Sequence, residues 1–151
     1  MDAVGRCHRV RRERGAELVE FALTFPMLLL VMLGIIDFGF LFQRYEALTN
    51  AAREGARVAV LPDYAEADVI ARVNTYLASG GLTGATPARL PNERIAIRPG
   101  LCMTIAGVRV TYPHNYMFLG PIVALMGGGG FAGKTLTVEA RMRYEGAAMS
   151  C

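Results

Sequence analysis

One stretch decides the fold: residues Arg11–Phe42, which read RRERGAELVEFALTFPMLLLVMLGIIDFGFLF. The stretch begins with clustered arginines, passes through Gly15 and Ala16, and is then almost wholly apolar. From Leu18 to Phe42 it has 25 residues. As a helix it would be about 37 Å long, at about 1.5 Å per residue. The hydrocarbon core of a bilayer is roughly 30 Å thick, so the segment predicts a transmembrane helix with some tilt.

The basic charge of the chain lies directly in front of this segment. The 151 residues carry a formal net charge of +3. Residues 1–15 hold five arginines against Asp2 and Glu13, and the rest of the chain holds 11 basic and 11 acidic residues. Positive charge beside an apolar span marks its cytoplasmic side, so we expect the N-terminus in the cytoplasm. The part after the leader has no basic cluster, and we therefore expect no nucleic-acid partner.

Two acidic residues, Glu20 and Asp37, lie in or near the apolar segment. A carboxylate at the centre of a membrane costs about 3 kcal/mol or more, so each needs a physical reason. We expect Asp37 to lie at the outer membrane interface. Glu20 either lies at the headgroup level, bonded to water or Arg14, or needs a positively charged partner that offsets the cost of its burial.

The apolar segment itself has three interpretations. A secretory signal peptide has an apolar core of about 7–15 residues followed by a small-x-small cleavage site. Here the core is longer, and the residues after Ile36 read DFGFLFQ, so cleavage by ordinary signal peptidase is not expected. The segment is either a plain N-terminal anchor or the helix of a prepilin, which is cut in front of the helix and keeps it.

The sequence from Arg11 to Val60 resembles the TadE-like proteins, which are minor pilins or pseudopilins of bacterial tight-adherence (Flp-type) pilus systems. The matching features are the basic leader, Gly15, the pair Glu20-Phe21 and a leucine-rich core interrupted by proline. They also include GIIDFG at Gly34–Gly39 and ALTNAAREGAR at Ala47–Arg57.

This resemblance implies that a prepilin peptidase cuts between Gly15 and Ala16. Glu20 then becomes the fifth mature residue, followed by Phe21, and pairs with the free N-terminal amine of a neighbouring subunit. Some TadE-like proteins resemble uncut anchors, so the resemblance leaves cleavage open. It implies as partners the inner membrane, other pilins or pseudopilins, the prepilin peptidase and the pilus assembly platform.

We expect three parts: a basic leader at 1–15, a transmembrane and extended helix at 16–61, and a small α+β extracytoplasmic domain at 62–151. The leader lacks an apolar period, so we expect it to be irregular. The helix should continue to Pro62, with a stripe of apolar and small side chains that packs on the protein's own sheet or on other subunits: Tyr45, Leu48, Ala52, Gly55 or Ala56, and Ala59. Glu54 and Arg57 should form an ion pair.

The C-terminal part predicts a second helix and a three-stranded antiparallel sheet. The helix is expected at Tyr64–Ser79, followed by a loop at Thr83–Pro91. The strands are expected at Arg94–Arg98, Val108–Tyr112 and Leu136–Tyr144, with a solvent-facing set of Arg94, Arg98, Arg109, Glu139, Arg141 and Arg143. The long connection before the last strand predicts a short helix near Pro121–Met126 and a flexible tip at Gly127–Gly130.

Nothing in the sequence predicts catalysis or a cofactor. The only histidine after the leader is His114, which we expect in a turn, and the only serines are Ser79 and Ser150. Neither the serines nor the cysteines have a recognisable base nearby in sequence. No close-spaced ligand pairs indicate a metal site. We expect no enzyme activity, no cofactor and no small-molecule substrate.

Two of the three cysteines follow the membrane segment. In an oxidising compartment Cys102 and Cys151 would close a loop of about 50 residues, worth about 3–4 kcal/mol in the chain-entropy model. The alternative is two free thiols.

Two hypotheses follow for the function. In the first, the chain is a membrane-anchored minor pilin or pseudopilin that takes part in assembly of adhesive pili. In the second, it is an uncleaved, signal-anchored periplasmic scaffold or binding module outside any filament. The position in a pilus, whether at the tip, in the shaft or in the assembly platform, is left open.

Overall fold

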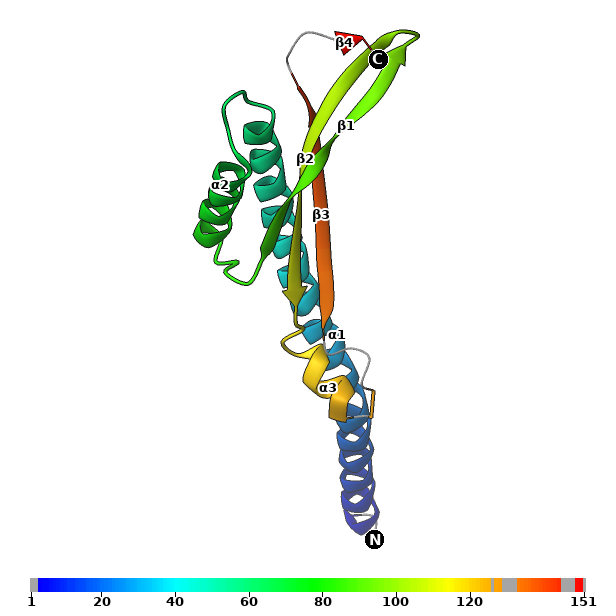
Figure 1. The fold of residues 1–151 in the computed structure, drawn as a ribbon. Helices are drawn as coiled ribbons and strands as arrows, with labels where there is room; N and C mark the ends of the chain where they lie inside the picture. Colours follow the sequence, from blue (N-terminus) through cyan, green and yellow to red (C-terminus); the bar gives the residue numbers. More distant parts are fainter. Residues whose placement is uncertain (1–2, 126, 129–132, 145–148, 151) are drawn as a thin grey trace.

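A single long helix forms the axis of the molecule. The structure is a computed structural model, and it describes residues 3–125, 127–128, 133–144 and 149–150, with side chains described from Gly15 to Tyr144. Helix α1 spans Ala3–Ala59, and its N-terminal part projects from the rest of the chain (Figure 1). We call residues Gly15–Ile36 of this helix the stalk.

Helix α1 is longer at its N-terminus than the sequence indicated. The leader is not irregular, because α1 already begins at Ala3. Extending an existing helix costs far less than nucleating one, and apart from Gly5 and Gly15 the leader holds no strong helix breaker. At the other end α1 stops at Ala59, close to the predicted break at Pro62. Pro26 lies inside the helix.

The strands form one antiparallel sheet. Strands β1 (Thr86–Arg98), β2 (Leu101–His114) and β3 (Lys134–Arg143) lie in the order β1-β2-β3. A short strand, β4 (Met149–Ser150), which the sequence did not indicate, pairs with the start of β2. The predicted α+β class, with a long N-terminal helix and a three-stranded antiparallel sheet, is confirmed.

Strand β1 corrects one expectation. The stretch Thr83–Pro91 was expected to be a loop, but β1 begins at Thr86 and includes Pro87 and Pro91. β1 is an edge strand, and proline is tolerated where the missing N–H faces no partner strand. The pairing with β2 shifts register between Leu90 and Glu93, around Pro91.

The core lies between one face of the sheet and two helices. Helix α2 (Glu66–Ser79) packs beside the C-terminal third of α1, and both cover the same side of the sheet (Figure 1). α2 lies where the second helix was expected. The buried apolar side chains come from α1, α2, β2 and β3, and include Leu48, Ala51, Ala52, Val58, Ala59, Val69, Val73, Leu77, Ala106, Val108, Val110, Leu136 and Val138. We call α2 together with the sheet the head, and this head packs on residues 48–59 of α1.

The small residues of α1 are used to pack against the chain's own sheet. A Cβ built on Gly55 would lie 2.4 Å from Val73 Cγ2 and 3.2 Å from Val108 Cγ2, so only glycine fits between α2 and β2 at this point. Leu48, Ala52, Ala56 and Ala59 of the predicted stripe are buried, whereas Tyr45 is exposed. Of the two alternatives for this stripe, packing within the chain is therefore the one observed.

All six residues of the predicted solvent-facing set are exposed, but they do not all lie on one face of the sheet. Arg94 pairs across the sheet with Thr104, which lies on the same face of β2 as the buried Ala106 and Val108. On the face away from the helices Arg109 pairs with Glu139, and Arg141 pairs with Glu93 and Glu139. Such exposed pairs each contribute about 0–1 kcal/mol, so their role is solubility more than stability.

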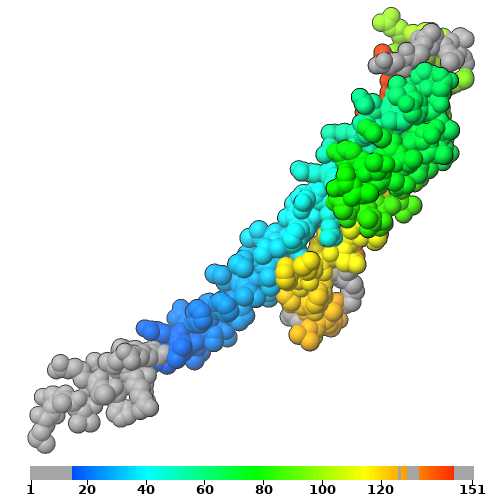
Figure 2. All heavy atoms as spheres, turned by 90° about the vertical axis from the view of Figure 1, so that its left-hand side faces the viewer, coloured from blue at the N-terminus to red at the C-terminus, as the bar shows by residue number. Residues whose placement is uncertain are grey.

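A short helix lies between the head and the stalk. Helix α3 (Leu119–Leu125) falls close to the range expected for it, and it lies against the flank of α1 below the sheet (Figures 1 and 2). Of the predicted glycine tip, Gly127 and Gly128 are described, and Gly129 and Gly130 lie outside the described residues.

Candidate functional site: the apolar helix and its junction with the head

The residues expected at a processing site lie on the exposed stalk. Gly15, Ala16, Glu20 and Phe21 are consecutive or one turn apart on α1, and all four are exposed. The Thr24 hydroxyl donates a hydrogen bond of 2.8 Å to the main-chain carbonyl of Glu20. Among the residues whose side chains the structure describes, the Glu20 carboxylate has no hydrogen-bond or ion-pair partner.

The surface of the stalk is apolar on every side. Within Gly15–Ala59 one segment is long and apolar enough to cross a membrane. In its most apolar part, none of the residues is buried by the described chain. Large side chains on all faces are exposed, for example Leu23, Met27, Leu28 and Ile35. A helix that is apolar all round needs an apolar surrounding, and the chain itself provides none here. This single N-terminal helix indicates a single-pass membrane anchor.

Asp37, which we expected at the outer membrane interface, is buried within the chain. It is only 1% exposed. Its carboxylate accepts three hydrogen bonds from main-chain N–H groups: 3.0 Å from Met117, 3.0 Å from Phe118 and 2.7 Å from Leu119. These N–H groups lie at the start of α3 and would otherwise lack intrahelical partners. Asp37 therefore caps α3 from another helix.

The end of β2 is attached to α1 about two helical turns above this cap, at Arg44. Arg44 donates a hydrogen bond of 2.8 Å to Nδ1 of His114, and its guanidinium lies 5.7 Å from the ring centre of Tyr112. His114 was expected in a turn, but it is the last residue of β2 and is 2% exposed. Its Nε2 atom is buried with no hydrogen-bond partner in the described part of the chain. Burial, and then the positive charge of Arg44, lower the pKa of His114, so the ring is neutral at pH 7.

Two aromatic side chains complete this attachment. The ring of Tyr116 lies edge-on to His114, with 5.0 Å between ring centres, and edge-on to Phe38, with 6.4 Å. We call the set Asp37, Arg44, His114 and Tyr116 the junction. It ties the segment between β2 and α3 to two turns of α1.

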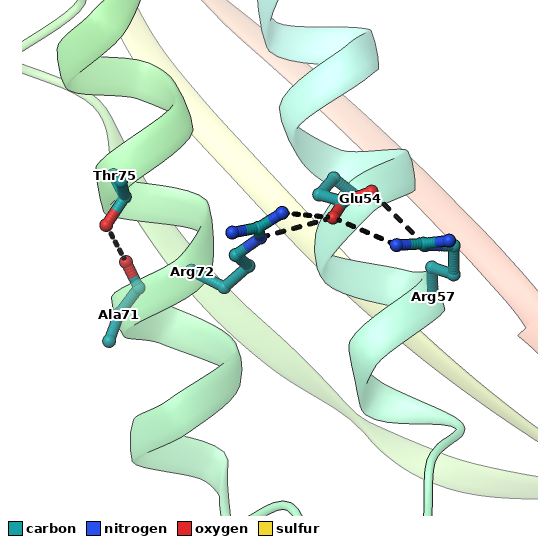
Figure 3. A network of polar contacts seen from close by, with 5 residues as sticks. All are labelled: Glu54, Arg57, Ala71, Arg72 and Thr75. Carbon is teal, nitrogen blue, oxygen red and sulfur yellow. Dashed lines mark hydrogen bonds and ion pairs between the residues drawn. The ribbon is translucent and has the colours of Figure 1, made fainter.

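A second polar cluster joins α1 to α2 in the head. The Glu54 carboxylate accepts hydrogen bonds from Arg72 at 2.9 and 3.1 Å and forms the predicted ion pair with Arg57 at 3.3 Å (Figure 3). The hydrogen bond from Arg72 is the main cause that lowers the pKa of Glu54. The cluster fixes the two helices relative to each other, and it stays charged at neutral pH.

Cys102 lies at the start of β2 and is disulfide-bonded. Its neighbour across the sheet is Met149 of β4, which brings the C-terminal end of the chain to this part of β2. Cys151 lies outside the described residues, so its assignment as the partner of Cys102 stays a prediction. Within the described residues, no group of three His, Cys, Asp or Glu side chains is placed to hold a metal ion.

The described geometry is that of a single-pass membrane anchor whose apolar helix continues into a small α+β head. The comparison with protein families then supplies the relationship. Residues 15–57 match the family model described as TadE-like protein, which confirms the resemblance expected for this stretch. No curated protein matches the chain, and no solved structure matches it.

The family match covers α1 only, whereas the structure also describes α2, α3 and the sheet. The match spans the stalk, Asp37 and most of the helix that the head packs on. It ends before α2, so the head is described by the structure alone. The junction was not found by sequence reasoning, although one signal for it was present: residues 115–133 contain no charged side chain, which is unusual for a surface loop.

Proposed function

We propose that this chain is a minor pilin or pseudopilin, anchored in the bacterial inner membrane, that takes part in assembly of tight-adherence pili and thereby in adhesion. One observation carries the proposal: the TadE-like match at 15–57 includes a long apolar helical segment, ahead of Asp37, in which no residue is buried by the described chain. In the membrane lipid covers that segment, and in a filament the helices of other pilins would cover it.

In this proposal the peptide bond between Gly15 and Ala16 is cut by a prepilin peptidase on the cytoplasmic side. The cut removes the five arginines of the leader and creates an N-terminal ammonium at Ala16. Glu20 is exposed and lies one turn further along α1. In a filament it would receive the ammonium of a neighbouring subunit. A carboxylate in an apolar surrounding is stabilised by an opposite charge within about 4 Å, so the pair would form only between correctly placed subunits.

The role proposed for the head is structural and not catalytic. The head lies outside the inner membrane in this arrangement, with α1 as its connection to the filament. Its packing on residues 48–59 of α1 makes the helix and the head one rigid unit, because Gly55 and the alanines allow close contact. A subunit that docks through the stalk therefore also fixes where its head is displayed.

The test of processing uses Gly15→Leu in cells with and without the prepilin peptidase. We expect the unsubstituted chain to lose residues 1–15 only when the peptidase is present, and Gly15→Leu to keep them. Gly34→Leu is the matched control, because Gly34 also lies on α1 with open space around it. An unchanged size of the unsubstituted chain in both strains would contradict the proposal.

The test of docking compares Glu20→Gln with Glu17→Gln. Both carboxylates are exposed on α1, but only Glu20 lies at the fifth position after the proposed cut. We expect Glu20→Gln to be processed normally and to be lost from sheared pili, whereas Glu17→Gln is retained. Equal incorporation of the two variants would remove Glu20 from the docking mechanism.

One observation favours the second candidate, an uncut periplasmic scaffold. Helix α1 runs without a break from Ala3 through Gly15, so cleavage after Gly15 requires the helix to open locally. The weak helix propensity of glycine lowers that cost by about 1 kcal/mol relative to alanine. In the uncut form the arginine-rich leader would remain as a cytoplasmic anchor.

A further inference from the structure

The segment around α3 has a composition that is unusual for a surface element. From Asn115 to Gly133 no residue carries a charge, and α3 itself reads LGPIVAL. Leu125, at its end, is 91% exposed, and Met117, just before it, is 60% exposed. Exposed apolar side chains that form one patch, uninterrupted by charge, mark a contact with an apolar partner.

The position of α3 relative to the membrane-spanning segment indicates that the apolar partner is lipid. The hydrocarbon core is roughly 30 Å thick, or about twenty helical residues, so a span that starts at Leu18 ends near Asp37. Asp37 is the residue that caps α3. From this cap α3 runs away from the sheet, toward the N-terminal end of α1, along the flank of the stalk (Figures 1 and 2). α3 therefore lies beside the last turns of the membrane-spanning segment and not above them.

The hydrogen bonding of α3 also fits an apolar surrounding. Main-chain groups that reach the membrane must be satisfied within the protein. At the N-terminal end, Asp37 accepts the N–H groups of Met117, Phe118 and Leu119. At the C-terminal end, Gly127 N donates to the Ala124 carbonyl at 3.1 Å and Gly128 N to the Val123 carbonyl at 2.9 Å.

The C-terminal pair is a Schellman motif, in which a residue with positive φ lets the chain turn back on the helix. Gly127 has a φ of 83°, and a Cβ on Gly128 would lie 2.6 Å from Val123 Cγ1. Glycine is therefore required at both positions, which explains part of the glycine run that follows α3. A helix of seven residues with both ends closed in this way has little need of water.

The apolar surface continues from α3 onto α1. Phe38 and Phe40 are 45% and 41% exposed at the level of the cap, and Phe42 is more exposed still. Phenylalanine side chains occur on helix faces that are buried at the boundary between headgroups and acyl chains. The surface of α3 is thus continuous with the surface of the stalk that meets lipid.

We propose that α3 is a second membrane-contacting element: a short foot that inserts from the outer side into the outer leaflet of the inner membrane, next to the membrane-spanning helix. Its partner is the lipid bilayer. The foot would set how deeply α1 sits, because Asp37 joins the two elements, and it would hold the head upright on the membrane before assembly. This proposal requires only the membrane anchor and does not depend on the pilin role.

The test uses tryptophan as a depth probe, since the chain contains none. Three full-length variants are compared in vesicles of phosphatidylcholine and phosphatidylglycerol, with and without lipids brominated on the acyl chains: Leu125→Trp, Met32→Trp and Ile97→Trp. Met32 is exposed on the stalk, and Ile97 is exposed on β1, at the far end of the head from α3 (Figure 1). All three side chains are exposed, so the substitutions should not disturb folding.

We expect Leu125→Trp to follow Met32→Trp, with a blue-shifted emission that brominated lipid quenches. Ile97→Trp should have a red-shifted emission that is not quenched. The proposal is overturned if Leu125→Trp behaves like Ile97→Trp. It is also overturned if Leu125→Trp is blue-shifted only at high protein-to-lipid ratio and without quenching, since that result would assign the surface to a second copy of the chain.

Discussion

The two halves of α1 have the same secondary structure and opposite surroundings. In the lower half, Gly15–Ile36, large apolar side chains point in all directions and are exposed. In the upper half, residues 48–59, one face of small side chains is buried against the chain's own sheet and α2, and the other face is polar. The difference shows that side-chain size and distribution around the helix, and not helicity, decide whether membrane or protein covers it.

The junction lies between the part of α1 that the chain leaves uncovered and the part that the head covers. Below Asp37 the described chain buries no residue of α1, and from Leu48 upward it buries most of one face. The junction is thus the point at which the position of the head becomes linked to the depth of the helix in the membrane.

The largest effect is expected when charged side chains replace apolar ones in the lower half of α1. The triple variant Leu28→Asp, Leu29→Asp and Leu30→Asp places three carboxylates in the middle of the lower half, at a cost of roughly 9 kcal/mol for insertion. We expect it to leave the membrane fraction on carbonate extraction. Leu48→Asp is the reciprocal control: it buries one unpaired charge in the head, so it should stay in the membrane and lose the thermal unfolding transition of the head.

A more local test uses one glycine from each half. Gly55→Leu must displace Val73 and Val108, whereas Gly39 has open space around it. Overpacking of this kind costs about 1–3 kcal/mol. We therefore expect a lower unfolding temperature of the detergent-solubilised protein for Gly55→Leu and little change for Gly39→Leu. A similar loss in both variants would mean that the head does not pack on α1 as described.

At the junction, Asp37→Ala leaves three main-chain N–H groups at the start of α3 without their acceptor. The loss of a helix cap typically costs about 0.5–2 kcal/mol. Amide hydrogen exchange should become faster at Met117, Phe118 and Leu119 and stay unchanged in β2. Glu46→Ala, an exposed acid on the same helix, is the control and should leave all these rates unchanged. Unchanged exchange in Asp37→Ala would refute the cap.

The smallest expected effect is a dependence of the stability of the head on pH, through His114. The pKa of His114 lies below its ordinary value of 6.5 because the ring is buried and faces Arg44, while Asp37 opposes this more weakly. The unfolded chain then binds the proton more readily than the folded one. Stability is complete above pH 6.5 and falls as the pH drops from there toward the folded pKa.

The measurement is the unfolding temperature of the head as the pH is lowered from about 7.5 to about 5.5. We expect a decrease that is smaller in His114→Gln, which cannot take up the proton. Carboxylates such as Glu54 contribute to both proteins alike and cancel in the comparison. Equal pH dependence of the two proteins would show that His114 does not titrate in this range.

Much of the fold follows from the sequence because it depends on local pattern. The apolar run from Leu18 predicts the stalk, and the period of small residues predicts a packing face of α1, on the sheet or on another subunit. Alternation predicts most of β3 but only Val108–Tyr112 of β2, which begins at Leu101. The start of β1 could not be predicted, because Pro87 and Pro91 exclude a central strand but are compatible with an edge, and only the assembled sheet shows which strand is at the edge.

The junction was missed for a different reason. The contact between Asp37 and Met117 joins residues 80 positions apart, and neither residue has a local pattern that points to the other. Asp37 could be recognised as needing an explanation, yet an interface position explained it equally well. His114 likewise gave no sign of burial, because its partner Arg44 lies 70 positions away. Charge-free composition from Asn115 to Gly133 was the available signal.

The proposed function depends most directly on the N-terminus of the mature protein. Intact-mass spectrometry of the chain extracted from membranes of cells that contain the prepilin peptidase measures it in one step. The account predicts a mass that corresponds to a chain beginning at Ala16, with the lower half of α1 intact and its leader gone. A mass that still includes residues 1–15 would contradict the pilin role and support the uncut anchor.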